Sequence, residues 1–142
     1  MVGSGRRTYK NAPLSAAASA LMVGAPQRRD MGYDTTSLDD VESVLPDDAG
    51  GLWFLKEPLD TEHVALSVLD LEPGVSGKEH SHDGQEEVYL VVEGGVEFDV
   101  GGEAVALDEG EALRVDADTT RQVHNGDERS RLVVAGAPRD AA

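Results

Sequence analysis

Short runs of apolar, often β-branched residues, separated by turn residues, fill the chain from residue 52 onward. The runs cover residues 52–55, 64–71, 88–92, 96–100, 104–107, 112–115, 121–124 and 132–135. Short strands at close spacing, with Gly and Asp between them, are typical of a β-sandwich or β-barrel. The Gly101-Gly102 pair between the fourth and fifth runs predicts a tight hairpin turn. We therefore predict a single all-β domain.

A short helix is predicted ahead of the first strand, over residues 37–45. Ser37 suits the N-cap position, and Asp39 and Asp40 suit the first turn, where the helix dipole favours negative charge. Pro46 and the glycines that follow it end the helix.

Acidic residues outnumber basic residues by 28 to 12, which gives a net charge of −16. Residues 1–30 carry a net charge of +4, so residues 31–142 carry −20. Such a surface repels phosphate, and we expect neither nucleic acid nor membrane as a partner. Many carboxylates with few lysines are typical of proteins from salt-loving archaea, so we predict a halophilic, cytoplasmic protein. The absence of cysteine excludes disulfides, thiolate metal sites and a cysteine nucleophile.

Residues 1–30 differ in composition from the rest of the chain, and three interpretations of them stay open. Arg6-Arg7, followed by the mildly apolar stretch 14–25, resembles a twin-arginine export signal. The segment could instead be a disordered tail, or translation could begin at Met31, where the acidic composition starts. All three interpretations place the folded domain at residues 31–142, with its barrel at about 50–136.

The group with the clearest chemistry is His80-Ser81-His82, followed by Glu87. Two histidines at positions i and i+2 of an extended chain point to the same side. A carboxylate from the next strand can close a third side of a metal ion. Imidazole and carboxylate ligands suit Fe, Mn, Ni, Cu or Zn. The sequence therefore predicts a divalent transition metal on His80, His82 and Glu87.

These residues stand in a pattern that resembles the first motif of the cupin family. The chain has Gly74, five residues, His80-x-His82, four residues, Glu87, six residues and Gly94. The resemblance implies a small jelly-roll barrel, here with a short N-terminal helix, and a metal in its interior. It also implies a superfamily that includes dioxygenases, isomerases and decarboxylases, and whose small members often form homodimers.

The second cupin motif is altered in this chain. It retains Gly110 and Asn125, but the Pro-x-Gly of the family is replaced by Asp-Ala-Asp at 116–118, and the histidine of the family is replaced by Arg121. A guanidinium group does not deprotonate in proteins and cannot bind a metal ion. Arg121 could pair with Glu87 and leave the site free of metal. Alternatively, it could bind an anionic substrate beside a metal with three protein ligands.

The alternation of side chains along a strand predicts the direction in which the neighbouring residues point. His124 lies an odd number of residues from Arg121, so a bulge would be needed to make it the fourth ligand. Glu86 should face solvent, opposite Glu87. Tyr89 shares the parity of Glu87 and should point into the barrel, where it either fills the core or offers its hydroxyl to a substrate.

Three functions are compatible with this sequence. The first is a metal-dependent oxygenase-type or isomerase-type enzyme that acts on a small carboxylate or phenolic substrate. The second is a non-catalytic module that binds a metal or a small ligand. The third is a metal-free barrel in which Arg121 pairs with Glu87. For the first two functions the expected partner is a small molecule, anionic if Arg121 binds it, and a homodimer could form.

The charge of −20 on residues 31–142 predicts that the fold needs salt. Mutual repulsion between carboxylates destabilises the compact state, and dissolved ions screen it. We expect the unfolding temperature to rise steeply between dilute buffer and molar KCl, as measured by circular dichroism. Full thermal stability in dilute buffer would contradict the prediction.

Overall fold

The computed structural model describes residues 31–140, so the segment 1–30, with its three open interpretations, lies outside the described residues. Thr35–Ala142 form one compact unit, and Met1–Asp34 belong to a separate unit. Within residues 31–140 no helix is long and apolar enough to cross a membrane.

Eight strands make up most of the described chain. They are β1 (Gly50–Phe54), β2 (Ala65–Leu71), β3 (Glu86–Glu93), β4 (Gly95–Val100), β5 (Glu103–Asp108), β6 (Ala112–Val115), β7 (Arg121–Asn125) and β8 (Ser130–Ala137). Each coincides with a predicted run, which confirms the all-β class. One short helix, α3 (Lys56–Leu59), was not predicted.

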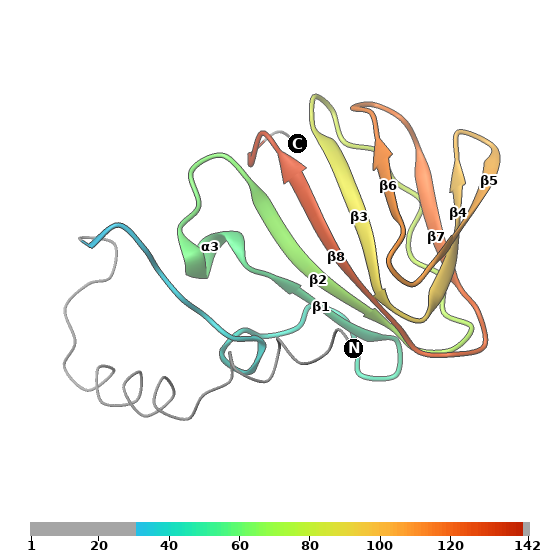
Figure 1. Cartoon of the computed structure of the whole chain (residues 1–142), viewed down its shortest axis with the longest axis horizontal. Coiled ribbons are helices and arrows are strands. Elements are labelled where there is room, and N and C mark those ends of the chain that lie inside the picture. Colours follow the sequence, from blue (N-terminus) through green and yellow to red (C-terminus); the bar gives the residue numbers. More distant parts are fainter. Residues whose placement is uncertain (1–30, 141–142) are drawn as a thin grey trace, which may run out of the picture. The chain divides into compact units, whose positions relative to one another are not determined.

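The strands form two antiparallel sheets, with the order β1-β2-β8-β3-β6 in one and β5-β4-β7 in the other (Figure 1). Strands distant in sequence are neighbours, since β8 lies between β2 and β3 and β7 lies beside β4. This arrangement is a jelly-roll barrel. Its core is built from both sheets and consists of Leu71, Tyr89, Val91, Val96, Phe98, Leu107, Val115, Val123, Leu132 and Val134.

Strand β3 shows how the alternating sequence positions the interior. Tyr89 and Val91 are buried, whereas Val88 and Leu90, which alternate with them, are exposed. The prediction that Tyr89 points into the barrel is therefore confirmed. Glu87 has the same parity, so its carboxylate also enters the barrel.

Three glycines are required by the backbone. Gly101 and Gly102 both have positive φ, 56° and 93°, which confirms the predicted hairpin turn between β4 and β5. Gly94 has a φ of 84°, and a Cβ atom there would lie 2.4 Å from Ser130 Oγ. A side chain at position 94 would therefore break the close approach of the β3–β4 connection to Ser130, at the start of β8.

The predicted helix at 37–45 is shorter than expected. Only the single 3-10 turn η2 (Leu38–Asp40) forms. Beyond it, the chain extends along the edge of β1, where the Val44 amide donates to the Leu52 carbonyl at 2.9 Å. Ser43 Oγ accepts a hydrogen bond from the Leu52 amide, also at 2.9 Å. Pairing with β1 thus replaces the remaining turns of the helix.

Asn125, the retained asparagine of the second motif, joins strand ends far apart in sequence. Its side-chain amide donates to the carbonyl groups of Leu71 and Glu128, at 3.0 and 2.8 Å. Its Oδ1 accepts a hydrogen bond from the Ser130 hydroxyl at 2.7 Å. Because Asn125 is buried and these groups are all satisfied, it holds β2, β7 and β8 in register.

Asp70, at the end of β2, is a fully buried carboxylate with a complete set of partners. It accepts hydrogen bonds from Arg131 Nε at 2.6 Å and from Arg129 Nη2 at 2.8 Å. Burial by itself would raise the pKa of Asp70, but the hydrogen bonds and charges of Arg131 and Arg129 outweigh it and hold the pKa below its ordinary value of 3.8. Asp70 therefore stabilises the fold in its charged form.

We predict that Asp70→Asn lowers the free energy of unfolding at neutral pH by about 1–3 kcal/mol, because both arginines lose a charged acceptor. Since the folded-state pKa is depressed, the contribution of Asp70 is present above pH 3.8 and is lost as the pH falls through the folded-state value. Urea denaturation at a series of pH values should show the gap between wild type and variant closing in acid. A gap that is constant with pH would contradict this assignment.

Candidate metal centre

The site is assembled by the backbone of residues 76–80, which runs along β7. His80 and Arg121 form an antiparallel bridge, in which each amide donates to the other residue's carbonyl at 2.9 Å. A second bridge joins Ser76 to His124. The first bridge brings the first histidine of one motif beside the altered residue of the other.

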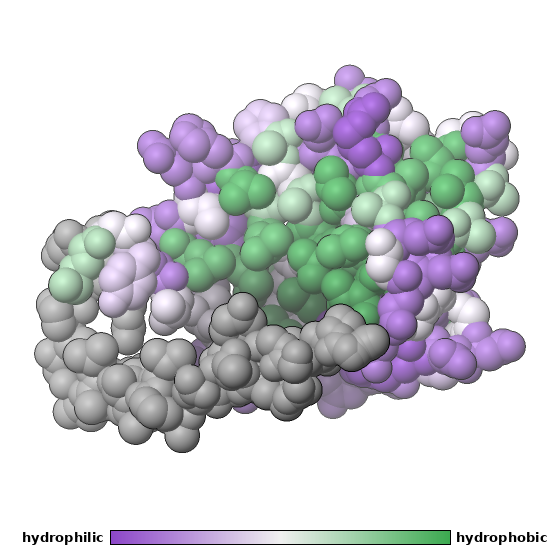
Figure 2. Space-filling view, in the orientation of Figure 1, coloured by the Kyte–Doolittle hydropathy of each residue, from purple (hydrophilic) through white to green (hydrophobic). Residues whose placement is uncertain are grey.

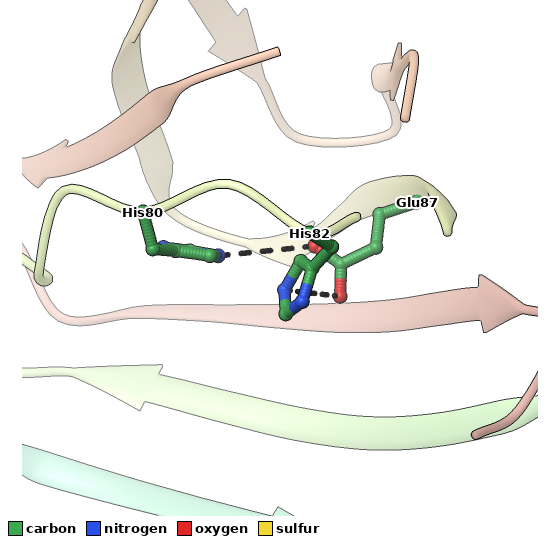
Figure 3. A group of neighbouring side chains, drawn as sticks. All are labelled: His80, His82 and Glu87. Carbon is green, nitrogen blue, oxygen red and sulfur yellow. Dashed lines mark ion pairs between the residues drawn. The ribbon is translucent and has the colours of Figure 1, made fainter. Parts of the chain in front are cut away.

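His80, His82 and Glu87 come together inside one end of the barrel (Figure 3). One nitrogen of each histidine and one carboxylate oxygen all lie within 4.8 Å of one another. His80 Nε2 is 4.0 Å from Glu87 Oε1, and His82 Nε2 is 3.6 Å from Glu87 Oε2. These atoms face one point, as the parity of the two histidines predicts.

Both histidines present a nitrogen that can bind a metal. The Nδ1 atom of His80 lies 2.9 Å from the Lys78 carbonyl, and an N–H donated there leaves the lone pair on Nε2, the nitrogen that faces Glu87. Burial lowers the pKa of His82, with the charge of Glu87 opposing and those of His80 and Arg121 adding to the effect. His82 is therefore biased toward the neutral form, which is the form that binds metal.

Tyr89 contacts the site directly, in addition to filling the core. Its hydroxyl donates to Glu87 Oε1 at 2.6 Å. Burial, together with the charge of Glu87 and this hydrogen bond, raises the pKa of Tyr89 far above its ordinary value. The hydroxyl stays protonated and orients the carboxylate of Glu87.

Arg121 points inward and its side chain is completely buried. Its Nη2 lies 3.8 Å from Glu87 Oε1, within ion-pair range but beyond hydrogen-bond distance. None of its three guanidinium nitrogens has a hydrogen-bond partner among the described residues. A buried charge whose donors are unsatisfied is costly, so this group needs an acceptor that the described chain does not supply.

The three side chains fit a divalent metal with open coordination positions. Two imidazoles and one carboxylate are the ligand types that such ions use, and one imidazole is held in the correct tautomer by a carbonyl group. The fourth side, where the family has a histidine, is occupied by the guanidinium of Arg121. Any metal on His80, His82 and Glu87 would therefore lie beside a fixed positive charge.

A cavity of about 460 Å³ opens from this cluster into the barrel. His80, His82, Glu87, Tyr89 and Arg121 line its polar end. Most of the remaining lining is apolar, and Figure 2 shows apolar residues gathering around a hollow in the visible face of the molecule.

Other residues considered from the sequence lie outside the cluster. His124 faces away, and its Nδ1 is 2.7 Å from Ser76 Oγ, so it is not a fourth member of the group. Glu86 is exposed and faces Arg114 at 3.5 Å, as parity predicts. Gln85 is buried, and its amide donates to the Pro138 carbonyl, which anchors the C-terminal segment.

Comparisons with known proteins agree with this geometry. The cupin domain model matches residues 67–136, whereas no curated protein matches the chain. KdgF from Halomonas sp. is 19% identical, with a TM-score of 0.64 over 76% of this chain and 94% of that one. A cupin protein from Bacteroides fragilis is 23% identical, with a TM-score of 0.63 over 78% and 88%. A predicted oxalate decarboxylase from Thermotoga maritima is 18% identical, with a TM-score of 0.62 over 73% and 98%.

The family match, the jelly-roll barrel and the His-His-Glu group agree, and the chain belongs to the cupin superfamily. At these identities the solved structures establish the fold alone, so the activity must be argued from the site.

Proposed function

We propose that this cupin binds a divalent transition metal (Fe, Mn, Ni, Cu or Zn) on His80, His82 and Glu87, and a small anionic ligand on Arg121. The observation that carries the proposal is the buried guanidinium of Arg121, which has no hydrogen-bond partner among residues 31–140 and lies 3.8 Å from Glu87 at the wall of the same cavity. A carboxylate or phenolate entering the cavity would supply the missing acceptor.

The side chains around the site have separate roles in this proposal. Arg121 binds and orients the anionic group of the ligand, and the hydroxyl of Tyr89 fixes the orientation of Glu87. The Lys78 carbonyl holds His80 in the tautomer that binds metal. A bound divalent metal would supply Lewis-acid or redox chemistry toward a ligand oxygen. This set of groups suits an oxygenase-type or isomerase-type reaction on a small carboxylate or phenolic substrate.

A non-catalytic module that binds the same ligand is the second candidate, and a specific contact favours it. The charge of Arg121 opposes the charge of a metal ion and also competes with it for Glu87. The metal-free alternative, in which Arg121 and Glu87 form a closed ion pair, is less favoured, since that pair leaves every guanidinium nitrogen without a hydrogen bond.

We predict that protein purified in high salt contains about one transition-metal ion per chain, as measured by elemental mass spectrometry. The double variant His80→Ala, His82→Ala should lose the metal. The matched control His63→Ala, His124→Ala removes the other two histidines of the chain and should retain it. No metal in the wild-type protein, even after reloading, would refute the metal site.

Arg121→His adds an internal test of the same site. It removes the repelling charge and restores the histidine of the family motif, so metal affinity should rise at least about tenfold. An unchanged affinity would mean that residue 121 does not face the metal.

The outer face of the larger sheet carries apolar side chains that are exposed on the described chain. Val88, Leu90 and Val92 of β3 are 38%, 37% and 41% exposed. Val133 of β8 lies opposite Leu90, and Val68 of β2 lies opposite Val133, so the apolar row continues across three strands. A contiguous apolar surface of this kind is typical of a protein contact.

We further propose that a second copy of the chain covers this row. In a two-fold symmetric dimer the same apolar row of both copies would meet at the interface. Leu90→Glu should convert a dimer to a monomer in light scattering, whereas Val44→Glu, which alters a more exposed valine beside β1, should leave the dimer intact. Dissociation by Val44→Glu alone would instead place the contact at the edge of β1. A monomeric wild type would refute the dimer.

A further inference from the structure

The cavity beyond the metal cluster differs sharply from its polar end. Ten of its lining residues are Ala, Val, Leu or Phe, among them Leu52, Leu69, Leu71, Phe98, Val123 and Val134. These side chains come from both sheets, so the apolar wall surrounds the interior. A volume of about 460 Å³ is within the usual range for pockets that enclose a small organic ligand.

Few polar groups are available along this apolar wall. Ser67 and Ser76 contribute hydroxyls, and Ser76 already lies 2.7 Å from His124 Nδ1. Lys78 is the remaining charged residue of the lining, and it is exposed, so its ammonium group stays solvated. A ligand rich in hydroxyls or with a second buried carboxylate would therefore lose hydration without gaining partners.

The charged end of the cavity, in contrast, can satisfy one anionic group. Arg121 offers three buried nitrogens without hydrogen bonds, and a carboxylate can accept two parallel hydrogen bonds from one guanidinium. Glu87 repels anions and directs them away from itself toward Arg121. The Tyr89 hydroxyl is engaged with Glu87, so it does not add a second anion site.

We propose that the ligand is an amphipathic monocarboxylate, with its carboxylate on Arg121 beside the metal position and an aromatic or branched hydrocarbon body in the apolar cavity. This inference rests on the anion-binding role of Arg121 in the proposed function, but it does not depend on the metal. It excludes oxalate-sized and sugar-acid ligands, because the former leave the apolar wall empty and the latter bury hydroxyls against it.

The inference is tested by calorimetric titration of the full-length protein in molar KCl, with chelator-treated and metal-reloaded samples measured in parallel. The probes are phenylacetate, acetate, oxalate, gluconate and phenylacetamide. Phenylacetate should bind at least tenfold more tightly than acetate, oxalate or gluconate. It should also bind at least tenfold more tightly than phenylacetamide, which has the same body without the charge.

Variants then separate the two ends of the cavity. Arg121→Gln should abolish the preference for phenylacetate over phenylacetamide, and Arg121→Lys should retain part of it. Leu69→Asn, on the cavity side of β2, should weaken the binding of phenylacetate severalfold and leave the binding of acetate unchanged. Val64→Asn, which alters an exposed valine just before β2 that does not line the cavity, is the matched control and should change neither. Circular dichroism verifies that each variant is folded.

The outcomes distinguish this inference from the proposed function. If gluconate or oxalate binds as tightly as phenylacetate, the inference of an amphipathic ligand is wrong, but the anion-binding role of Arg121 is not contradicted. Phenylacetate binding that is insensitive to Arg121→Gln would overturn both. If the wild-type protein takes up no metal even after reloading but still binds phenylacetate, this inference would be supported and the metal centre refuted.

Discussion

The backbone bridge between His80 and Arg121 is the contact on which the site depends. It pairs an irregular segment with β7 through two hydrogen bonds of 2.9 Å, and neither bond involves a side chain. Whatever residue occupies position 121 is therefore directed into the barrel beside His80 and Glu87. The fold supplies the position, and the residue type decides the chemistry, so arginine can replace the histidine of the family without disturbing the jelly roll.

Two buried charged side chains in the molecule differ in how many hydrogen bonds they form. Asp70 is fully buried and accepts short hydrogen bonds from two arginines, as a structural ion pair requires. The side chain of Arg121 is equally buried, and its guanidinium has no hydrogen bond to any described group. Proteins seldom leave a buried polar group unpaired, and exceptions concentrate where a ligand completes the set. The contrast separates a charge that holds the fold together from a charge that the described residues leave without a hydrogen bond.

The acidic exterior and the apolar interior act on an anionic ligand in different ways. The surface of residues 31–142 repels anions at long range, but salt shortens that repulsion to a few ångströms at molar concentration. The attraction of Arg121 operates inside a buried cavity, where screening by ions is weak. High salt would therefore relieve the repulsion more than it weakens binding.

Local sequence determined the eight strands, the hairpin at Gly101-Gly102 and the side of β3 on which Glu87 and Tyr89 lie, because alternation and turn residues act over a few positions. Even the grouping of His80, His82 and Glu87 follows from their spacing in the sequence. Only the tertiary structure decided that the predicted helix yields to pairing with β1. It also decided that the guanidinium of Arg121 is buried with no hydrogen bond to the described residues, and that an apolar cavity lies beside it. Those features depend on which distant strands meet, and no local pattern specifies what two sheets enclose.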